Sequence, residues 1–351
     1  MAETRIEKAE DLGEGSKGTA SLWSQEITSA RKYMRKFREG AIRINRRYLD
    51  QRDANQEGEF RVNLFWSTVQ VIMSMLYAQP PKADVKRLYD DFTDEPGRVG
   101  AEILERILNN DVQADGSTSN AAIQYAIQDW ITIGMGTVWS RYSVDTEMTT
   151  YDAVSDPVTG MELSPAGEYE RITNENALTE YVYWDDFLYS PARIWEEVRW
   201  VARRAYMTKE QLVARFGPEV ANQIPLAKQS SKATDAKGQM PTMPEDPWQR
   251  AEVWEIWDKR TKKVYWYNDK VDFMLDERDD PLQLENFFPC PPALMANLST
   301  TNLMPRSDFI MAQDQFEQLD EINTRITWLT RAAKVVGVYD RGAAGIQRMF
   351  N

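Results

Sequence analysis

The stretch "SDFIMAQDQFEQLDEINTRITWLTRAAKV", residues 307–335, decides how the chain is interpreted. Its apolar residues recur at spacings of three and four, which is the period of a narrow stripe along one side of an α-helix. Such a stripe is typical of a helix that packs against neighbouring helices. We therefore expect one long helix over 307–335 whose seam contacts other subunits. The candidate interface residues are Phe309, Phe316, Leu319, Ile322, Ile326 and Leu329.

The charged residues of the same helix are segregated along its length. Acidic side chains occupy the first half and basic ones the second, which suits the helix dipole. In a ring of identical, tilted helices this order would also place the basic half of one subunit beside the acidic half of the next. The candidates for inter-subunit charges are Asp314, Glu317, Asp320, Glu321, Arg325, Arg331 and Lys334.

The remainder of the chain predicts an α+β protein, helical over 21–133 and rich in strands over 137–290. Residues 1–20 are polar and are expected to be disordered. Helices are expected over 22–52, with a break at Gly40, and over 60–82, 97–112 and 118–133. The segment 60–82 is apolar nearly all round, so we expect it to be buried on more than one face.

Strand patterns dominate the middle of the chain. Val253–Trp257 and Val264–Tyr267, joined by a polar turn, predict a hairpin. The composition of 227–247 predicts a mobile loop, and the prolines of 287–308 exclude a helix over the first half of that passage.

Composition limits the chemistry that the chain can perform. There are 351 residues with a net charge of −13, a single cysteine and no histidine. Nucleophiles that need a histidine base are therefore excluded, as are most zinc sites. Cys290 cannot form an internal disulfide, which agrees with a reducing cytoplasm. No apolar run approaches the ~20 residues of a membrane-spanning helix, so no membrane partner is expected.

Three pairs of adjacent aspartates are the only candidates for metal-dependent chemistry. They are Asp90-Asp91, Asp185-Asp186 and Asp279-Asp280. Neighbouring side chains diverge on a strand, and each pair lies at an expected turn, where aspartate bonds to the local backbone. We therefore assign no catalytic, metal or cofactor site and expect no enzyme. A metal-dependent nuclease that uses these pairs remains the alternative.

The segment 31–52 is the one strongly basic element, with nine Lys or Arg residues against two acids. Such a helix commonly presents a solvated face that packs on acidic neighbours. The functional alternative is a nucleic-acid-binding adaptor, for which Arg43, Arg46 and Arg47 are the candidates. The acidic balance of the whole chain argues against a protein that coats DNA, because such binding depends on a basic surface.

Four stretches, in this order along the chain, resemble the portal (head-to-tail connector) proteins of tailed bacteriophages. They are "NLFWSTVQVIMSMLYAQPPKADVKR" (63–87), "YVYWDDFLYSPARIWEEVRWVARRAYMTKEQLVARFG" (181–217), "VWEIWDKRTKKVYWY" (253–267) and "QDQFEQLDEINTRITWL" (313–329). The resemblance covers about residues 30–340. It implies a homo-oligomeric ring, a dodecamer in assembled particles, at one vertex of the capsid, through which double-stranded DNA is packaged and ejected.

The resemblance also implies domains, partners and a location. Residues 21–300 would form the wing, 307–335 the stem helix and 336–351 the start of the clip. The charged residues named above on the polar side of the stem helix are then candidates to face the channel. The rest of the clip, a second stem helix, the tunnel loop and the crown are expected to be missing from this chain. The implied partners are other copies of the chain, the major capsid protein, the terminase large subunit and the head-tail adaptor. The implied location is the virion, after assembly in the host cytoplasm.

Overall fold

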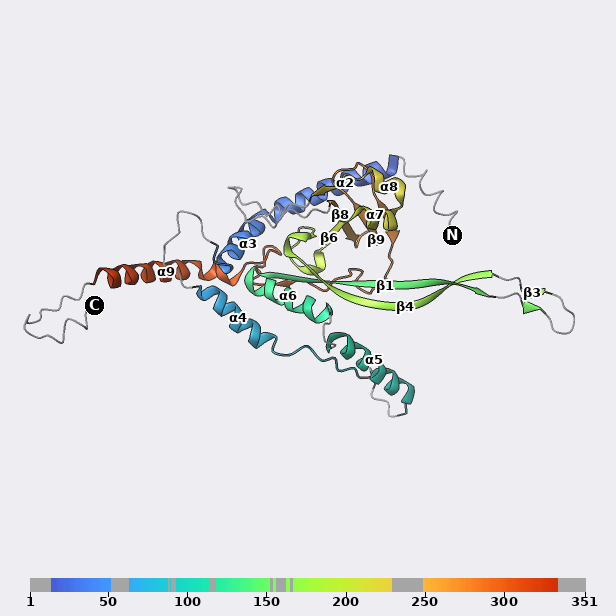
Figure 1. Ribbon diagram of the computed structural model, residues 1–351, viewed down its shortest axis with the longest axis horizontal. Coiled ribbons are helices and arrows are strands. Elements are labelled where there is room, and N and C mark those ends of the chain that lie inside the picture. The colour runs from blue at the N-terminus through green and yellow to red at the C-terminus, as the bar shows by residue number, and fades with distance from the viewer. Residues whose placement is uncertain are drawn as a thin grey trace, which may run out of the picture.

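The computed structural model describes residues 14–51, 63–87, 89, 93–113, 118–151, 154–155, 162–164, 167–228 and 249–333. Within them the fold is α+β, with helices packed around two larger antiparallel sheets (Figure 1). The predicted α+β class is confirmed, and in the described chain the helices between Glu14 and Thr132 precede the strands, which begin at Met135.

The chain begins with two helices that run almost end to end, α2 (Glu14–Tyr33) and α3 (Arg35–Tyr48). The prediction of disorder through residue 20 is therefore wrong from Glu14 onward. The expected break at Gly40 is also wrong, because the interruption lies at Met34. Backbone hydrogen bonds continue across it, from Met34 N to Ala30 O at 2.9 Å and from Arg38 N to Met34 O at 3.0 Å.

The longest strands are β1 (Met135–Tyr151) and β4 (Gly167–Val182), which pair in antiparallel order. The short strand β11 (Leu294–Met295) adds to the inner end of β1 and completes a three-stranded sheet. Farther out, β1 and β4 continue as a two-stranded ribbon that extends away from the body of the molecule (Figure 1). The strands β2 (Val154–Ser155) and β3 (Glu162–Ser164) pair beyond it.

The second sheet has the strand order β10-β9-β8-β6-β5, with β7 paired to β8. Its predicted hairpin is confirmed, since Trp254 pairs with Tyr267 and Trp257 with Val264. Residues 229–248, most of the predicted loop, lie outside the described residues. The strands are β5 (Phe187–Tyr189), β6 (Trp200–Met207), β7 (Ala227–Lys228), β8 (Gln249–Asp258), β9 (Lys263–Tyr267) and β10 (Asp276–Asp279).

Two short helices follow β6, α7 (Lys209–Phe216) and α8 (Pro218–Gln223). The side chain of Thr208 accepts a hydrogen bond from Gln211 N, and the Gln211 side chain accepts one from Thr208 N, so a capping box begins α7. Gly217 ends it with φ 87°, a conformation that favours glycine.

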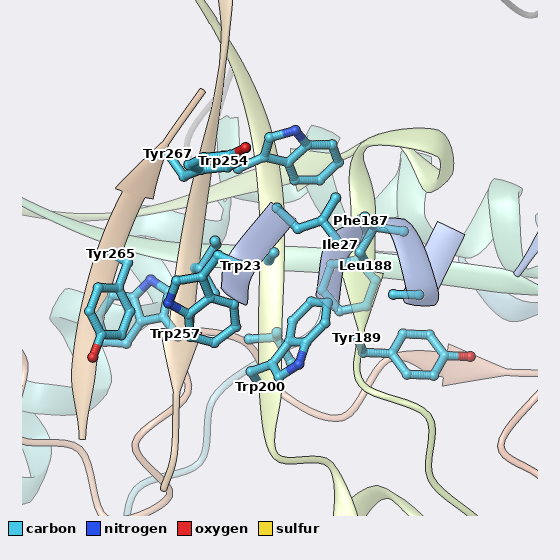
Figure 2. Packing of buried hydrophobic residues seen from close by; sticks show 14 of the residues in the cluster. Trp23, Ile27, Phe187, Leu188, Tyr189, Trp200, Trp254, Trp257, Tyr265 and Tyr267 are labelled. Carbon is cyan, nitrogen blue, oxygen red and sulfur yellow. The ribbon is translucent and has the colours of Figure 1, made fainter. Parts of the chain in front are cut away.

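The main hydrophobic core lies between α2 and the second sheet. The rings of Trp23 and Trp200 meet edge to face with centroids 5.8 Å apart, and Tyr265 lies 5.4 Å from Trp23 (Figure 2). Ile27 points into the same cluster from the next turn of α2. Aromatic pairs of this geometry contribute about 0.5–1.5 kcal/mol each beyond the area they bury. The aromatic residues of the sheet therefore hold α2 in place.

A second, smaller core joins four helices, α3, α4 (Leu64–Leu76), α6 (Thr118–Thr132) and α9 (Asp308–Ala332). The helix α5 (Glu95–Gln113) packs against α6. The expectation that α4 is buried on more than one face is wrong for the single chain. Phe65 and Val69 are buried in this core, whereas Trp66 is half exposed and Met75 is 76% exposed. The second apolar face of α4 is open because no other element of the described chain covers it.

Candidate assembly surface on helix α9

The start of α9 is fixed by hydrogen bonds to the end of α6. Ser307 is fully buried, and its Oγ donates to the carbonyl of Thr132 at 2.6 Å while it accepts from Phe309 N at 3.1 Å. Gly134 makes this approach possible, because it has φ +100° and an added Cβ would lie 3.0 Å from Ser307 N. The predicted helix is thus confirmed over Asp308–Ala332 and leaves the body in a defined direction.

An aromatic cluster continues this attachment. Phe309 and Phe316 stack with centroids 5.4 Å apart, and Phe65 of α4 lies 4.7 Å from Phe309 and 6.1 Å from Phe316. The apolar stripe expected to face other subunits therefore begins in the chain's own core, where Phe309 is buried and Phe316 is half-buried.

Beyond Phe316 the same stripe continues without cover from the described chain. Leu319 and Ile322 are 41% and 51% exposed, and the exposure reaches 70% at Leu329. We define the open seam as Leu319, Ile322, Ile326 and Leu329. At its first two positions, Phe309 and Phe316, the stripe packs against Phe65 of another helix, α4. The open seam presents the same kind of surface without such a helix.

Trp328 is a second exposed apolar residue that the sequence pattern did not single out. At 3.6 residues per turn it lies about 100° around the helix from Leu329 and about 160° from Ile326, so it is outside the open seam. It is 70% exposed. The helix α9 therefore exposes apolar side chains beyond the open seam as well.

Several of the predicted α9 charges are already paired within the chain. Asp320 Oδ2 lies 2.7 Å from Arg47 Nη2, and both side chains are largely buried. Arg325 bonds to Glu321 one turn earlier at 2.6 Å, and Glu317 accepts a hydrogen bond from Gln313 at 2.8 Å. Asp314 and Arg331 are exposed, whereas Lys334 lies outside the described residues.

The basic segment divides into an inner and an outer set. On the inner side, Arg31 pairs with Asp269 at 3.1 Å, Arg38 with Asp185, and Arg47 with Asp320. Arg46 is half-buried and has interactions of its own. On the outer side, Lys32, Arg35, Lys36 and Arg43 are exposed. The predicted packing of this helix on acidic neighbours is thus confirmed for the inner set.

The structure changes the interpretation of Asp185-Asp186. Their side chains do not diverge or bond to a local turn. Arg204 Nη2 lies 3.0 Å from Asp185 Oδ2 and 2.6 Å from Asp186 Oδ1, and Arg38 contacts Asp185 from the other side. The two side chains converge because Trp184–Asp186 forms a short 3₁₀ turn, in which neighbouring side chains do not alternate as they do along a strand. Burial raises the pKa of Asp186, while the Arg204 guanidinium opposes that shift.

The other aspartate pairs and the remaining chemistry are simpler. Asp280 Oδ1 accepts from the backbone of Gln283 at 2.8 Å, which is the expected turn role, and Asp90-Asp91 lie outside the described residues. In the part of the chain that the structure describes, no group of three or more His, Cys, Asp or Glu side chains could hold a metal ion. Among the described helices, none combines the length and the hydrophobicity that a membrane span requires.

The helices α4 and α5 expose further apolar side chains. On α4 these are Trp66, Val71, Met75 and Leu76, and on α5 they are Val99, Ile103, Leu104, Ile107 and Leu108. The helical periodicity of both segments is evident in the sequence, but the absence of a covering partner is evident only in the structure. Exposed apolar surface on this scale marks an interaction site in soluble proteins.

Comparison with models of protein families gives no match, and no curated protein matches the chain.

Proposed function

We propose that the chain is a subunit of a homo-oligomeric ring of the portal type, which lies at one capsid vertex and conducts double-stranded DNA during packaging and ejection. The open seam of α9 is the observation that carries this proposal. It is an apolar stripe of helix-packing period, continuous with residues that pack in the chain's own core. The role in DNA packaging and ejection is proposed from the four sequence stretches that resemble portal proteins in the same order.

The charge of α9 supports the same assembly. Asp314 is exposed in the acidic first half and Arg331 is exposed in the last turn. Both charges are therefore accessible to a neighbouring helix. A neighbouring α9 that is displaced along the helix axis would bring opposite charges together, which would favour one direction of stagger.

The proposal extends to partners and location. The ring would consist of about twelve copies, by resemblance to the portal family, and would contact the major capsid protein, the terminase large subunit and the head-tail adaptor. It would act as a conduit and a docking platform in the virion, without catalysis of its own.

Electron microscopy and light scattering of the purified chain test the ring. Wild type is expected to form closed rings with a central hole. Ile322→Glu combined with Ile326→Glu should abolish the closed rings, because each carboxylate would be desolvated at the helix contact. The matched control, Ile322→Leu with Ile326→Leu, keeps the apolar stripe and should still form rings. Wild type that stays monomeric at every concentration would contradict the proposal.

The two alternatives predict different results. A nuclease would nick plasmid DNA in Mg²⁺ or Mn²⁺, and Asp185→Ala would abolish the activity. An adaptor would bind duplex DNA with strong salt dependence. That binding would be lost when Arg43, Arg46 and Arg47 become Glu.

A further inference from the structure

The outer part of the β1–β4 ribbon has no packing partner in the described chain. We call it the arm and define it as Tyr142–Thr150 together with Glu168–Ala177. All of its residues are exposed except Ser143 and Thr149, which are half-buried. Nine residues of strand span about 30 Å. A two-stranded ribbon without a covering layer is marginally stable at best, so an arm of this length is suited to a contact outside its own chain.

The two faces of the arm differ in character. Residues directly opposite in the ladder share a face, so Tyr142 lies beside Ala177, Val144 beside Glu175, and Met148 beside Glu170. A bulge near Asp145 shifts the register and brings Ile172 beside Thr146. We call this side the arm face. It carries the apolar residues Tyr142, Val144, Met148, Ile172 and Ala177 and the acidic residues Glu168, Glu170 and Glu175.

The arm face has three acids and no basic residue, a net charge of −3. Contacts within the face hold two of these acids in place. Glu170 accepts a hydrogen bond from Thr146 at 2.7 Å, and Glu175 interacts with the Tyr142 hydroxyl. The opposite face has a net charge of only −1, because Asp145 and Glu147 are set against Arg171, which lies directly across from Glu147. The exposed apolar stripe and the larger share of the negative charge therefore coincide on one side.

A surface of complementary charge lies on α2 and α3 of the same chain. Lys32, Arg35, Lys36 and Arg43 are exposed, with Glu39 as the one exposed acid among them, a net charge of +3. Their spacing places all five on one side of the helix pair, opposite the buried face of α3. We call this surface the basic strip. The aliphatic stems of lysine and arginine can also cover apolar side chains.

We propose that the arm face of one copy docks on the basic strip of a second copy. In its own chain the arm runs away from α3, so the two surfaces cannot meet there (Figure 1). Pairing of two arm faces would oppose like charges, which excludes a symmetric arm-to-arm contact. This contact is separate from the open seam of α9, and it would tie copies together through the outer part of the molecule.

Charge reversal tests the docking. Glu170→Lys with Glu175→Lys should weaken self-association of the full chain at least tenfold in sedimentation velocity, and Lys36→Glu with Arg43→Glu should do the same. Combining all four substitutions in one chain should restore the assembly constant to within about threefold of wild type. The control exchanges a pair on the other face, Glu147→Lys with Arg171→Glu, and should leave association unchanged.

Disulfide capture gives an independent readout. Glu170→Cys and Lys36→Cys, made in separate chains and mixed under oxidising conditions, should yield a covalent dimer. Each alone should remain monomeric in a denaturing gel, because Cys290 is buried and burial raises the pKa of its thiol to about 12. An unchanged assembly constant in both reversal variants, or no rescue by their combination, would overturn the docking. Rings that persist in that case would still support the α9 contact.

Discussion

Arg204 is the residue on which the polar network beside the main core depends. Its guanidinium contacts Asp185 and Asp186 and lies over the ring of Trp254, with 5.6 Å to the centroid. Both carboxylates are largely buried. The charges of these two acids are therefore compensated by two arginines, Arg38 and Arg204. The fold brings both arginines together from distant parts of the sequence.

We expect Arg204→Ala to destabilise the protein by about 3–5 kcal/mol, because removal of one partner of a buried ion pair leaves the other charge uncompensated. The matched variant is Arg199→Ala. Arg199 is more exposed and pairs with Glu26, so its loss should cost under about 1 kcal/mol. Urea unfolding monitored by tryptophan fluorescence measures both. Equal losses in the two variants would contradict this account of the network.

Asp129 gives the fold a pH dependence. Burial raises its pKa to about 7, against the effect of a hydrogen bond donated by the Tyr181 hydroxyl. Because the pKa in the folded state is above that of the unfolded chain, stability falls as the pH rises between about 4 and 7. Asp129→Asn should therefore stabilise the protein by roughly 1–3 kcal/mol at pH 8 and have little effect at pH 4. Urea unfolding at several pH values measures the difference, and a variant whose advantage is the same at both pH values would contradict it.

At the scale of elements, α6 packs directly against β1. A Cβ at Gly136 would overlap the carbonyl of Ala126, so the helix backbone rests directly on the strand. We expect Gly136→Ala to cost about 3 kcal/mol or more in the free energy of unfolding, because backbone would have to move. The control is Gly18→Ala in α2, where the space is open, and it should stabilise the helix by about 0.5–1 kcal/mol. In thermal unfolding, Gly136→Ala should lower the Tm and Gly18→Ala should raise it.

Elements whose signal is local could be predicted from the sequence. The stripe of α9 and the hairpin of β8 and β9 appear at almost the predicted residues, since spacing and turn residues determine them. The interruption at Met34 carried no such signal, while Gly40, which did, is accommodated inside α3. Likewise, the role of Asp185 depends on Arg38, 147 residues away, and no local pattern contains that information.

The candidate site was predictable only in part. Periodicity identified the α9 stripe, but it could not tell which members pack in the chain's own core and which stay open. Phe316 packs against Phe65, whereas Leu319, one turn later, is exposed. The same ambiguity explains the error on α4, because an apolar helix surface looks identical whether it is buried by its own chain or by a partner.

At the scale of the whole molecule, we expect stability to depend on protein concentration. Association that buries the open seam would favour the folded, assembled state by mass action. The Tm of wild type should therefore rise over a hundredfold increase in concentration, and this rise should be smaller in Ile322→Glu with Ile326→Glu. Differential scanning calorimetry at several concentrations measures it. A Tm that is independent of concentration in both proteins would contradict this expectation.

The nearly continuous α2–α3 pair has a mechanical consequence. Its first half packs in the main core through Trp23 and Ile27, and its second half packs in the smaller core through Ile44 and Tyr48. Because backbone hydrogen bonds cross the interruption at Met34, the pair forms a rigid connection between the two cores. If either core unfolds, one end of the α2–α3 pair loses the residues against which it packs. Heat or force that destabilises one core should therefore destabilise the other, and the body of the molecule should unfold as a single cooperative unit.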